Sequence, residues 1–455
     1  MSAATREIAE FACAPHEPPA DHAGRLARAL LDTVGCALAA TGSPIETILR
    51  TWSERECGSG RSTIWTTGAQ VTASQAAFAN GTAAHALDWD DVSPGAVMHP
   101  SAVLLAALLP EGEDTAVDGP ALVAAYDVGA SVFRAVAQAL PRAEHYGRGW
   151  HTTSTVGRLA AVAALSAVRG LDVETTQNAL GLAASLAAGS LANFGTMTKP
   201  LHVGAAARDA VLAVSLATDG FTANPRQLEA DDGFFAMYGD RALQALDDLP
   251  EALEHWRIAW PDDLAVKRYP ACYATHRAID AALELRDGLG RRLPEQVEVV
   301  VEPRGLRPLI AHEPSSPTEA RFSMAFAVSV ALVRGEVRLC HFTDAGFHDN
   351  DVRALMTRVR ARESTVPPLG PGAFEEGYAV VTVNPGGEAR VDDTYGSPQR
   401  PLSDADIEAK FADCCAAGGL EPAVAARLAA MLGGLPTAPR TPSLGDVLLG
   451  PLPPD

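Results

Sequence analysis

Apolar residues recur at helical spacing from about residue 20 to residue 245. An interval of four residues brings apolar side chains onto one face of an α-helix, which then packs against its neighbours. The interval is clearest in two sets: Leu26, Leu30, Val34 and Leu38, and Val128, Val132, Val136 and Leu140. Breaks at residues 41–44 and 110–119 separate the predicted helices. We therefore predict a large all-helical domain, the first part of which covers residues 1–261.

The pattern changes after residue 261. Residues 296–302 and 378–383 are rich in β-branched side chains and are predicted as strands, whereas residues 318–333 and 351–361 keep helical spacing. We predict a smaller α+β domain over residues 262–400, inserted as a lid, and C-terminal helices over residues 401–455 that return to the helical domain. The fold is thus predicted to be mainly α, with a substrate cleft at the junction of the two parts.

Lysine is rare in this chain. Of 36 basic residues only Lys199, Lys267 and Lys410 are lysines. An exposed lysine exchanges easily for arginine, but an ammonium that must approach a substrate closely or have its pKa lowered does not. Lys199 and Lys267 each lie near a proline and a histidine, so we predict that both are functional; the alternative is chance survival. Lys410 falls in an amphipathic stretch, residues 404–417, and is predicted to be solvated.

Charge and composition restrict the partners. The net charge of −20 argues against a nucleic acid or an anionic membrane as partner. Seven cysteines without a Cys-x-x-Cys motif argue against a zinc ribbon or a typical iron–sulfur site. The first 20 residues lack the apolar segment of a signal peptide, and the longest uninterrupted apolar runs are shorter than a bilayer span. We expect a cytoplasmic protein with no membrane contact.

Three candidate proton-transfer residues come directly before or at the start of predicted helices. His99 and Lys199 each precede a proline, which suits the first helical position, and His151 precedes Thr and Ser residues that can cap a helix. Free backbone N–H groups and the helix dipole favour an anion at such an end, and they lower the pKa of a lysine or histidine. Three such ends predict a small polycarboxylate as substrate.

Three carboxylates, Asp88, Asp90 and Asp91, follow the predicted helix over residues 75–87. Such a triplet can bind Mg²⁺ or can be a solvated acidic turn. We favour a third interpretation, in which one aspartate orients a nearby histidine and raises its pKa, so that the imidazolium can serve as a general acid. No metal is expected.

Lys267 and His276 lie nine residues apart at the predicted hinge. We expect closure of the lid to bring both over the substrate. Arg321 begins a predicted lid helix and could bind a further carboxylate. Phosphate-binding Gly-rich loops, Gly-x-Ser-x-Gly and dinucleotide fingerprints are missing from the sequence, which argues against nucleotide cofactors and serine hydrolysis.

Four motifs, in this order, resemble those of the MmgE/PrpD family: residues 80–91 with His99-Pro100, 149–151, 193–208 and 267–276. The family includes 2-methylcitrate dehydratase, cis-aconitate decarboxylase and iminodisuccinate epimerase, and the resemblance spans nearly the whole chain. It implies a helical domain with an α+β lid, a homodimer, and no metal or organic cofactor. The catalytic residues it implies are Asp88, His99, His151, Lys199, Lys267 and His276. The substrate-binding residues expected beside them are Asp91, Thr196, His202, Arg268, Tyr269 and Arg321.

The resemblance leaves the reaction open. We expect a cofactor-independent lyase, a dehydratase or decarboxylase, that acts on a small di- or tricarboxylic acid through proton transfer at a carbon next to a carboxylate. The alternative is an epimerase or isomerase of an imino- or aminodicarboxylate such as iminodisuccinate; a third is a non-catalytic ligand-binding homologue. Residues 195–202 resemble the decarboxylases and epimerases, but Val92 stands where the decarboxylases carry Thr.

Overall fold

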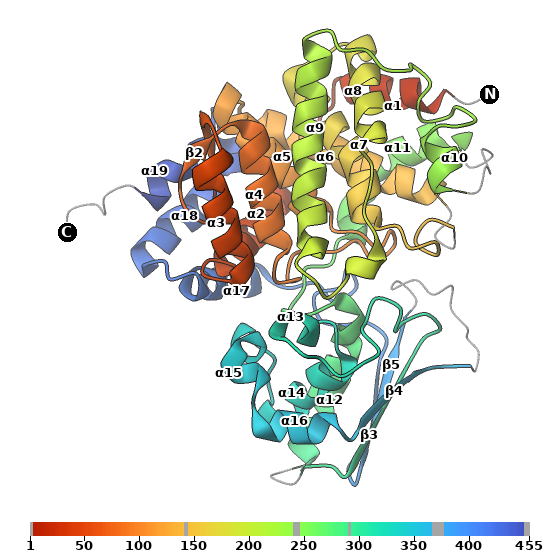
Figure 1. The fold of residues 1–455 in the computed structure, drawn as a ribbon, viewed down its shortest axis with the longest axis vertical. Coiled ribbons are helices and arrows are strands. Elements are labelled where there is room, and N and C mark those ends of the chain that lie inside the picture. The colour runs from red at the N-terminus through yellow and green to blue at the C-terminus, as the bar shows by residue number, and fades with distance from the viewer. Residues whose placement is uncertain (1–2, 141–143, 240–245, 290–292, 366–376, 450–455) are drawn as a thin grey trace.

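The computed structural model describes residues 3–140, 144–239, 246–289, 293–365 and 377–449. A helical body and a smaller α+β body lie one above the other along the longest axis (Figure 1). The first part of the helical body contains α1 (Ala4–Cys13), α2 (His22–Ala39), α3 (Pro44–Glu56), β1 (Ser59–Thr63), β2 (Gln70–Val71), α4 (Ala73–His85), α5 (Pro100–Thr115), α6 (Gly119–Ala139), α7 (Thr152–Arg169), α8 (Val173–Ser185), α9 (Thr198–Thr218), α10 (Phe234–Tyr238) and α11 (Leu249–Ala259). The α+β body contains α12 (His276–Leu289), β3 (Gln296–Val301), α13 (Pro317–Ala320), α14 (Met324–Arg334), α15 (Asp344–Phe347), α16 (Asn350–Met356), β4 (Val359–Glu363), β5 (Ala379–Asn384) and β6 (Gly387–Val391). The chain then returns to the helical body as α17 (Asp404–Ala417), α18 (Pro422–Gly434) and α19 (Leu444–Leu448).

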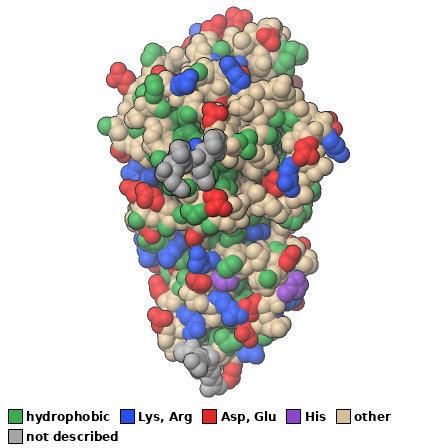
Figure 2. Space-filling view, turned by 90° about the vertical axis from the view of Figure 1, so that its left-hand side faces the viewer, with side chains coloured by type: hydrophobic (Ala, Val, Ile, Leu, Met, Phe, Trp, Pro, Cys, Tyr) green, Lys and Arg blue, Asp and Glu red, His purple; other side chains and the backbone are tan. Residues whose placement is uncertain are grey.

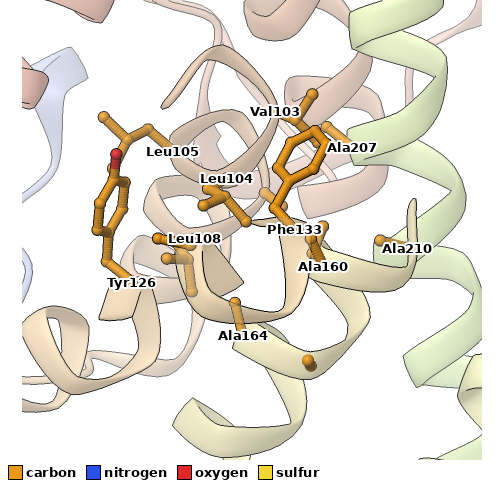
Figure 3. Close-up of a cluster of buried hydrophobic side chains, with 14 of the residues drawn as sticks. Val103, Leu104, Leu105, Leu108, Tyr126, Phe133, Ala160, Ala164, Ala207 and Ala210 are labelled. Carbon is orange, nitrogen blue, oxygen red and sulfur yellow. The ribbon is translucent and has the colours of Figure 1, made fainter. Parts of the chain in front are cut away.

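Small residues let the central helices approach closely. A Cβ on Gly81 of α4 would lie 2.9 Å from Cα of Gly204 on α9, so the two backbones touch at this crossing. Around α5, α6 and α7 the core is filled by side chains such as Leu104, Leu108 and Phe133 (Figure 3). The close approach of α4 and α9 at Gly81 and Gly204 brings the end of α4 near the start of α9, where the candidate residues lie.

Helices α6 and α9 are long and apolar enough to cross a membrane by length and composition. In the structure 78% and 67% of their apolar windows are buried inside the protein. Packing against neighbouring helices therefore accounts for their apolar character.

The sheet of the α+β body has the order β4-β3-β5-β6. Strand β3 pairs in parallel with β4, Val299 opposite Ala361, and antiparallel with β5, Val299 opposite Val381. Alternate residues of β3 are buried, and they form one core with α12 and α14. The prediction of a mainly α fold with a smaller α+β unit is confirmed.

Four strands differ from the sequence prediction. The helix predicted over residues 351–361 ends at Met356, and β4 follows it as an edge strand. Strand β6 and the hairpin of β1 and β2 in the helical body were not predicted. Each of these strands is short and is stabilised by pairing with another strand. Apolar spacing within one segment does not reveal such pairing.

The chain passes between the bodies at residues 264–275 and returns at residues 392–403, after which α17 packs on α2. Val92, in the loop after α4, pairs with Ala265 through two backbone hydrogen bonds of 2.9 and 2.8 Å. The first crossing segment is thereby attached to the loop that carries the acidic triplet.

Candidate active site

A cavity of about 30 Å³ lies where the loop after α4 and the starts of α5, α7 and α9 meet the first crossing segment. The starting end of α9 faces the α+β body (Figure 1). The residues that line the cavity are Asp88, Val92, Val97, His99, Tyr146, His151, Phe194, Lys199, Lys267, Cys272, Tyr273 and Pro308. Five of the six predicted catalytic residues are therefore together.

The three predicted helix starts are confirmed. His99 immediately precedes α5, His151 immediately precedes α7, and Lys199 is the second residue of α9. All three are buried. The positive dipole ends of their helices favour an anion, although several of the first backbone N–H groups are already bonded, that of Ser101 to Asp91 and those of Thr198 and Lys199 to Thr196.

Asp88 lies at the centre of the charges. The Nζ atoms of Lys199 and Lys267 lie 2.6 and 3.2 Å from the same oxygen, Oδ1, of Asp88. Lys267 also donates a hydrogen bond of 2.8 Å to the backbone carbonyl of Asp88. Oδ2 of Asp88 is buried without a hydrogen-bond partner among the described residues. Asp88 has φ 51°, in the left-handed region that a non-glycine residue adopts at a cost, and such strain is frequent at functional sites.

The two lysines determine the charge state of this group. Burial alone would raise the pKa of Asp88, but the ammoniums of Lys199 and Lys267 outweigh burial and hold this pKa well below its usual range. Burial likewise opposes the charge of Lys267, yet Asp88 and Asp90 raise its pKa above the ordinary value. The cavity therefore contains a carboxylate with at least one permanent ammonium beside it.

The histidines around Asp88 are neutral. Nδ1 of His85 lies 2.9 Å from Asp90, and its Nε2 lies 2.8 Å from Nζ of Lys199, so Nδ1 donates to the carboxylate and Nε2 accepts from the ammonium. Burial, with the positive charge of the lysines, lowers the pKa of His99 and His151 well below its usual range, and burial also lowers that of His85. The expectation that an aspartate raises the pKa of a histidine here is wrong, because loss of solvent and the lysine charges outweigh the carboxylates.

Both parts of this chain match models of one protein family. A family model described as the MmgE/PrpD N-terminal domain matches residues 6–245, and one described as the MmgE/PrpD C-terminal domain matches residues 269–431. This chain belongs to the MmgE/PrpD family. It is 30% identical to the cis-aconitate decarboxylase of Mus musculus over 404 residues, which cover 85% of this chain and 81% of the relative. It is 30% identical to the Homo sapiens cis-aconitate decarboxylase over 85% of this chain and 82% of the relative. It is 25% identical to that of Aspergillus terreus over 77% of this chain and 75% of the relative. The match supports an enzyme of the lyase type.

His276, the sixth predicted catalytic residue of this MmgE/PrpD chain, is buried but does not line the cavity. Its Nε2 lies 3.2 Å from the carbonyl of Ala271, and its Nδ1 has no partner among the described residues. Burial lowers the pKa of His276 to about 3. Lys267 already contacts Asp88 in this structure, and the expectation that closure of a lid brings Lys267 and His276 over the substrate stays a prediction.

Two of the predicted substrate-binding residues, His202 and Asp91, do not line the cavity but contact residues that do. Nδ1 of His202 lies 3.1 Å from Nδ1 of His151, so one of the two rings donates to the other and fixes its orientation. Asp91 accepts hydrogen bonds from the hydroxyl and the N–H of Ser101, and its carbonyl lies 2.7 Å from Nδ1 of His99. Burial and the charge of Asp32 raise the pKa of Asp91 to about 7.

Three further predicted substrate-binding residues, Thr196, Arg268 and Tyr269, do not line the cavity. Thr196 is exposed, and its hydroxyl donates to the carbonyl of Asn193. Arg268 is exposed, with its guanidinium 4.6 Å from the ring centre of Tyr395. Tyr269 donates to Asp280 over 2.5 Å. A binding role for these residues stays a prediction.

Arg321 is buried in the α+β body, and the charge of Asp88 affects its pKa. Burial lowers its pKa to about 10, and the Asp88 carboxylate partly offsets this. The nearby rings of Phe194 and Phe322 lie 4.9 and 5.2 Å from Nζ of Lys199. Both bodies therefore contribute to the surroundings of the same ammonium.

Lys410 is not the solvated residue that the sequence predicted. Its Nζ lies 2.5 Å from Asp32 and donates to the carbonyls of Trp89 and Lys267 over 2.7 and 2.9 Å. Sequence reasoning also missed the central contacts of His85 and Asp90, although both fall within the first motif. A buried partner for Lys410 lies 378 residues away on α2, which no local pattern indicates.

Four side chains could hold a metal ion, since one ligand atom from each of His85, Asp88, Asp90 and His99 lies within 4.8 Å of the others. The lysines argue against a divalent ion here. Lys199 already donates to His85 and Asp88, and Lys267 stands beside the same carboxylate oxygen. A divalent cation would have to approach two ammoniums and displace their hydrogen bonds.

Proposed function

We propose that this chain is a lyase that removes carbon dioxide from a small unsaturated tricarboxylate of the cis-aconitate type with its own side chains alone. The observation that carries the proposal is the buried pair of ammoniums, Lys199 and Lys267, at 2.6 and 3.2 Å from one oxygen of Asp88 in a cavity lined by histidines. A substrate carboxylate resembles that of Asp88 and would interact with the same ammoniums. The relatives named cis-aconitate decarboxylase support this substrate.

Decarboxylation of cis-aconitate takes up one proton and moves one double bond. The C–C bond to the departing carboxylate breaks, and its electron pair forms a new C=C bond as carbon dioxide leaves. The former C=C electron pair shifts to the carbon next to another carboxylate, so that an enolate-like charge spreads over that carboxylate. This carbon then takes a proton, and the trianion plus one proton become a dianion plus carbon dioxide.

The lysines supply what this charge shift needs. Lys267 stays an ammonium because Asp88 and Asp90 raise its pKa, so it can stabilise the developing enolate charge without gaining or losing a proton. The Lys199 ammonium has two aromatic rings within 5.2 Å. With water excluded by these rings, the attraction between ammonium and carboxylate is stronger than in solution.

A histidine is the proposed source of the proton. His99 and His151 line the cavity and are neutral, because burial and the lysines lower their pKa values. A bound trianion adds negative charge beside both rings and so raises both pKa values. The acid therefore forms when substrate binds, and the proton can pass to the carbon next to the enolate carboxylate.

Substrate access requires a change of shape. A cavity of about 30 Å³ has the volume of roughly one water molecule, which is far too little for a tricarboxylate. We propose that the two bodies separate at residues 264–275 to admit substrate and close again around it. A bound tricarboxylate should then slow hydrogen exchange in this segment.

The proposal is tested by incubating the protein with cis-aconitate in D₂O and analysing the product by mass spectrometry. Decarboxylation removes 44 mass units and places one deuterium on carbon. Loss of 18 units from a hydroxy acid such as citrate, with cis-aconitate unchanged, would show a dehydratase instead. Deuterium gain without mass loss on aspartate-derived acids would show an epimerase, and no reaction with any of these acids would favour a ligand-binding homologue.

A further inference from the structure

We propose that Lys410 is a positioning residue, which holds the backbone of Asp88-Trp89 and of Lys267 in the geometry that the reaction needs. The inference rests on the proposed function, since it assigns Lys410 a part in the same site. Lys410 lies on α17, after the α+β body, and its ammonium contacts no side chain that lines the cavity. It acts through two carbonyl groups.

The ammonium of Lys410 lies among three oxygens. It donates to the carbonyls of Trp89 and Lys267 over 2.7 and 2.9 Å, and it forms an ion pair with Oδ1 of Asp32 at 2.5 Å, whose geometry is not that of a hydrogen bond. The side chain is only 6% exposed. Three segments that are remote in sequence thus meet at one buried nitrogen.

Both carbonyls belong to the backbone of the cluster. Trp89 directly follows Asp88, whose left-handed backbone at φ 51° must be held by its surroundings. Lys267 in turn donates from Nζ to the carbonyl of Asp88 over 2.8 Å, and the indole of Trp89 donates to the carbonyl of Arg268 over 3.2 Å. Four hydrogen bonds therefore connect residues 88–89 with residues 267–268, and Lys410 provides two of them.

Lys410 lies on the opposite side of this connection from the reacting groups. With Trp89 and Arg268 it lines a neighbouring cavity, whereas Asp88 and Lys267 line the catalytic cavity. Burial opposes its charge, but Asp32 on α2 raises the pKa of Lys410 above its ordinary value, so it remains a donor. The ion pair with Asp32 attaches the connection to the rigid helical core.

The geometry requires lysine. An ammonium is a compact centre that donates in three directions, whereas a guanidinium is planar and spreads its donors over several atoms. Arginine at this position could keep the charge but could not place one nitrogen between these three oxygens. This accounts for a lysine in a chain whose other basic residues are nearly all arginine.

The test uses Lys410→Met and Lys410→Arg in the full-length protein, with Glu111→Gln as the matched control. Glu111 is buried and forms an ion pair with the partly exposed Arg169 at the far end of α7, so its loss should affect stability alone. Displacement of a reacting group by about 1 Å can cost on the order of 10²-fold in rate, and we expect kcat to fall by this factor in both Lys410 variants. Hydrogen exchange at Val92 and Ala265 should accelerate in both, but not in Glu111→Gln.

Three outcomes would overturn the proposal: kcat within twofold of wild type in Lys410→Met, recovery of kcat by Lys410→Arg, or unchanged exchange at Val92 and Ala265. If Lys410→Met does not fold, the double variant Asp32→Asn/Lys410→Met removes the unpaired buried carboxylate and is measured instead. Exchange needs no substrate. A wild-type protein without turnover would therefore disprove the proposed function, while the exchange result would still decide whether Lys410 holds this backbone.

Discussion

Two buried carboxylates in this protein each have two cations, yet the cations are arranged differently. Asp209 in the middle of α9 receives Arg158 on Oδ2 at 2.9 Å and Arg208 on Oδ1 at 2.7 Å. Asp88 receives Lys199 and Lys267 on one oxygen, Oδ1, at 2.6 and 3.2 Å, while Oδ2 has no partner among the described residues.

The difference separates a structural ion pair from a candidate site. At Asp209 each oxygen has its own guanidinium partner, so the carboxylate is fully paired and joins α7 to α9. At Asp88 two ammoniums crowd one oxygen beside a cavity, so they can interact with a second carboxylate at modest cost. Acidic and basic side chains are interspersed on the face shown in Figure 2. This agrees with a substrate anion that is attracted by the buried ammoniums beside Asp88 and not by a charged surface. The following experiments test this distinction.

Lys199→Arg should have the largest effect. Arginine keeps the positive charge but not the compact shape that places Nζ 2.6 Å from Asp88 and 2.8 Å from His85, so kcat should fall by roughly two to three decades, as for loss of one positioned electrostatic group. Arg208→Lys, the reverse exchange on the same helix, is the control and should keep kcat within twofold. The measurements are steady-state turnover of cis-aconitate and the melting temperature. Near-normal kcat in Lys199→Arg would remove Lys199 from the mechanism.

Asp209→Asn should affect stability and spare the chemistry. The change leaves Arg158 buried without its carboxylate, and breaking such a pair costs about 3–5 kcal/mol. Urea unfolding should show this loss, whereas kcat at a temperature where the variant is folded should be unchanged. Asp88→Asn is the counterpart and should lower kcat by decades. A tenfold fall of kcat in folded Asp209→Asn would contradict the assignment of Asp209 to structure alone.

Acid should destabilise the protein through histidines outside the cavity as well. His145 has partners at both ring nitrogens, the carbonyl of Tyr238 at 3.1 Å and the hydroxyl of Thr155 at 2.8 Å, and burial lowers its pKa to about 4. Between pH 4 and 6.5 the unfolded chain binds a proton at this ring and the folded protein does not. The free energy of unfolding therefore falls as pH falls, by up to about 1.4 kcal/mol per pH unit from this residue.

His145→Gln should make this dependence shallower between pH 6.5 and 4, with kcat at neutral pH retained. Urea unfolding at several pH values measures the slope. Asp91, with its pKa raised to about 7, contributes with the opposite sign in the same range, but it is common to both proteins and cancels in the difference. An identical slope in variant and wild type would show that His145 accepts a proton in the folded protein.

Chelation should have the smallest effect. The lysines beside Asp88 supply the positive charge of the proposed mechanism, so EDTA or phenanthroline should leave kcat unchanged. Activity measured before and after chelator, and again after Mg²⁺ or Zn²⁺ is added back, is the readout. A loss that the metal restores would assign His85, Asp88, Asp90 and His99 as ligands instead.

Part of the site could be predicted because its signals are local. A proline followed by an apolar helical run indicated the start of α5, and the same signal indicated the start of α9. His99 and Lys199 were therefore expected beside free N–H groups. The strand β4 could not be predicted in this way, because its stability comes from pairing with β3, and the helical spacing of α16 runs into it.

The sequence by itself determined most of the helical segments, the starts of α5, α7 and α9, and that two of three lysines belong to motifs. These properties depend on neighbours within a few residues, which the order of side chains fixes. Only the tertiary structure decided that Lys199 and Lys267 share one oxygen of Asp88, that the histidines are neutral, and that Lys410 is buried against Asp32. These depend on contacts between residues from 111 to 378 positions apart, and on the loss of solvent around them, which helical spacing does not encode.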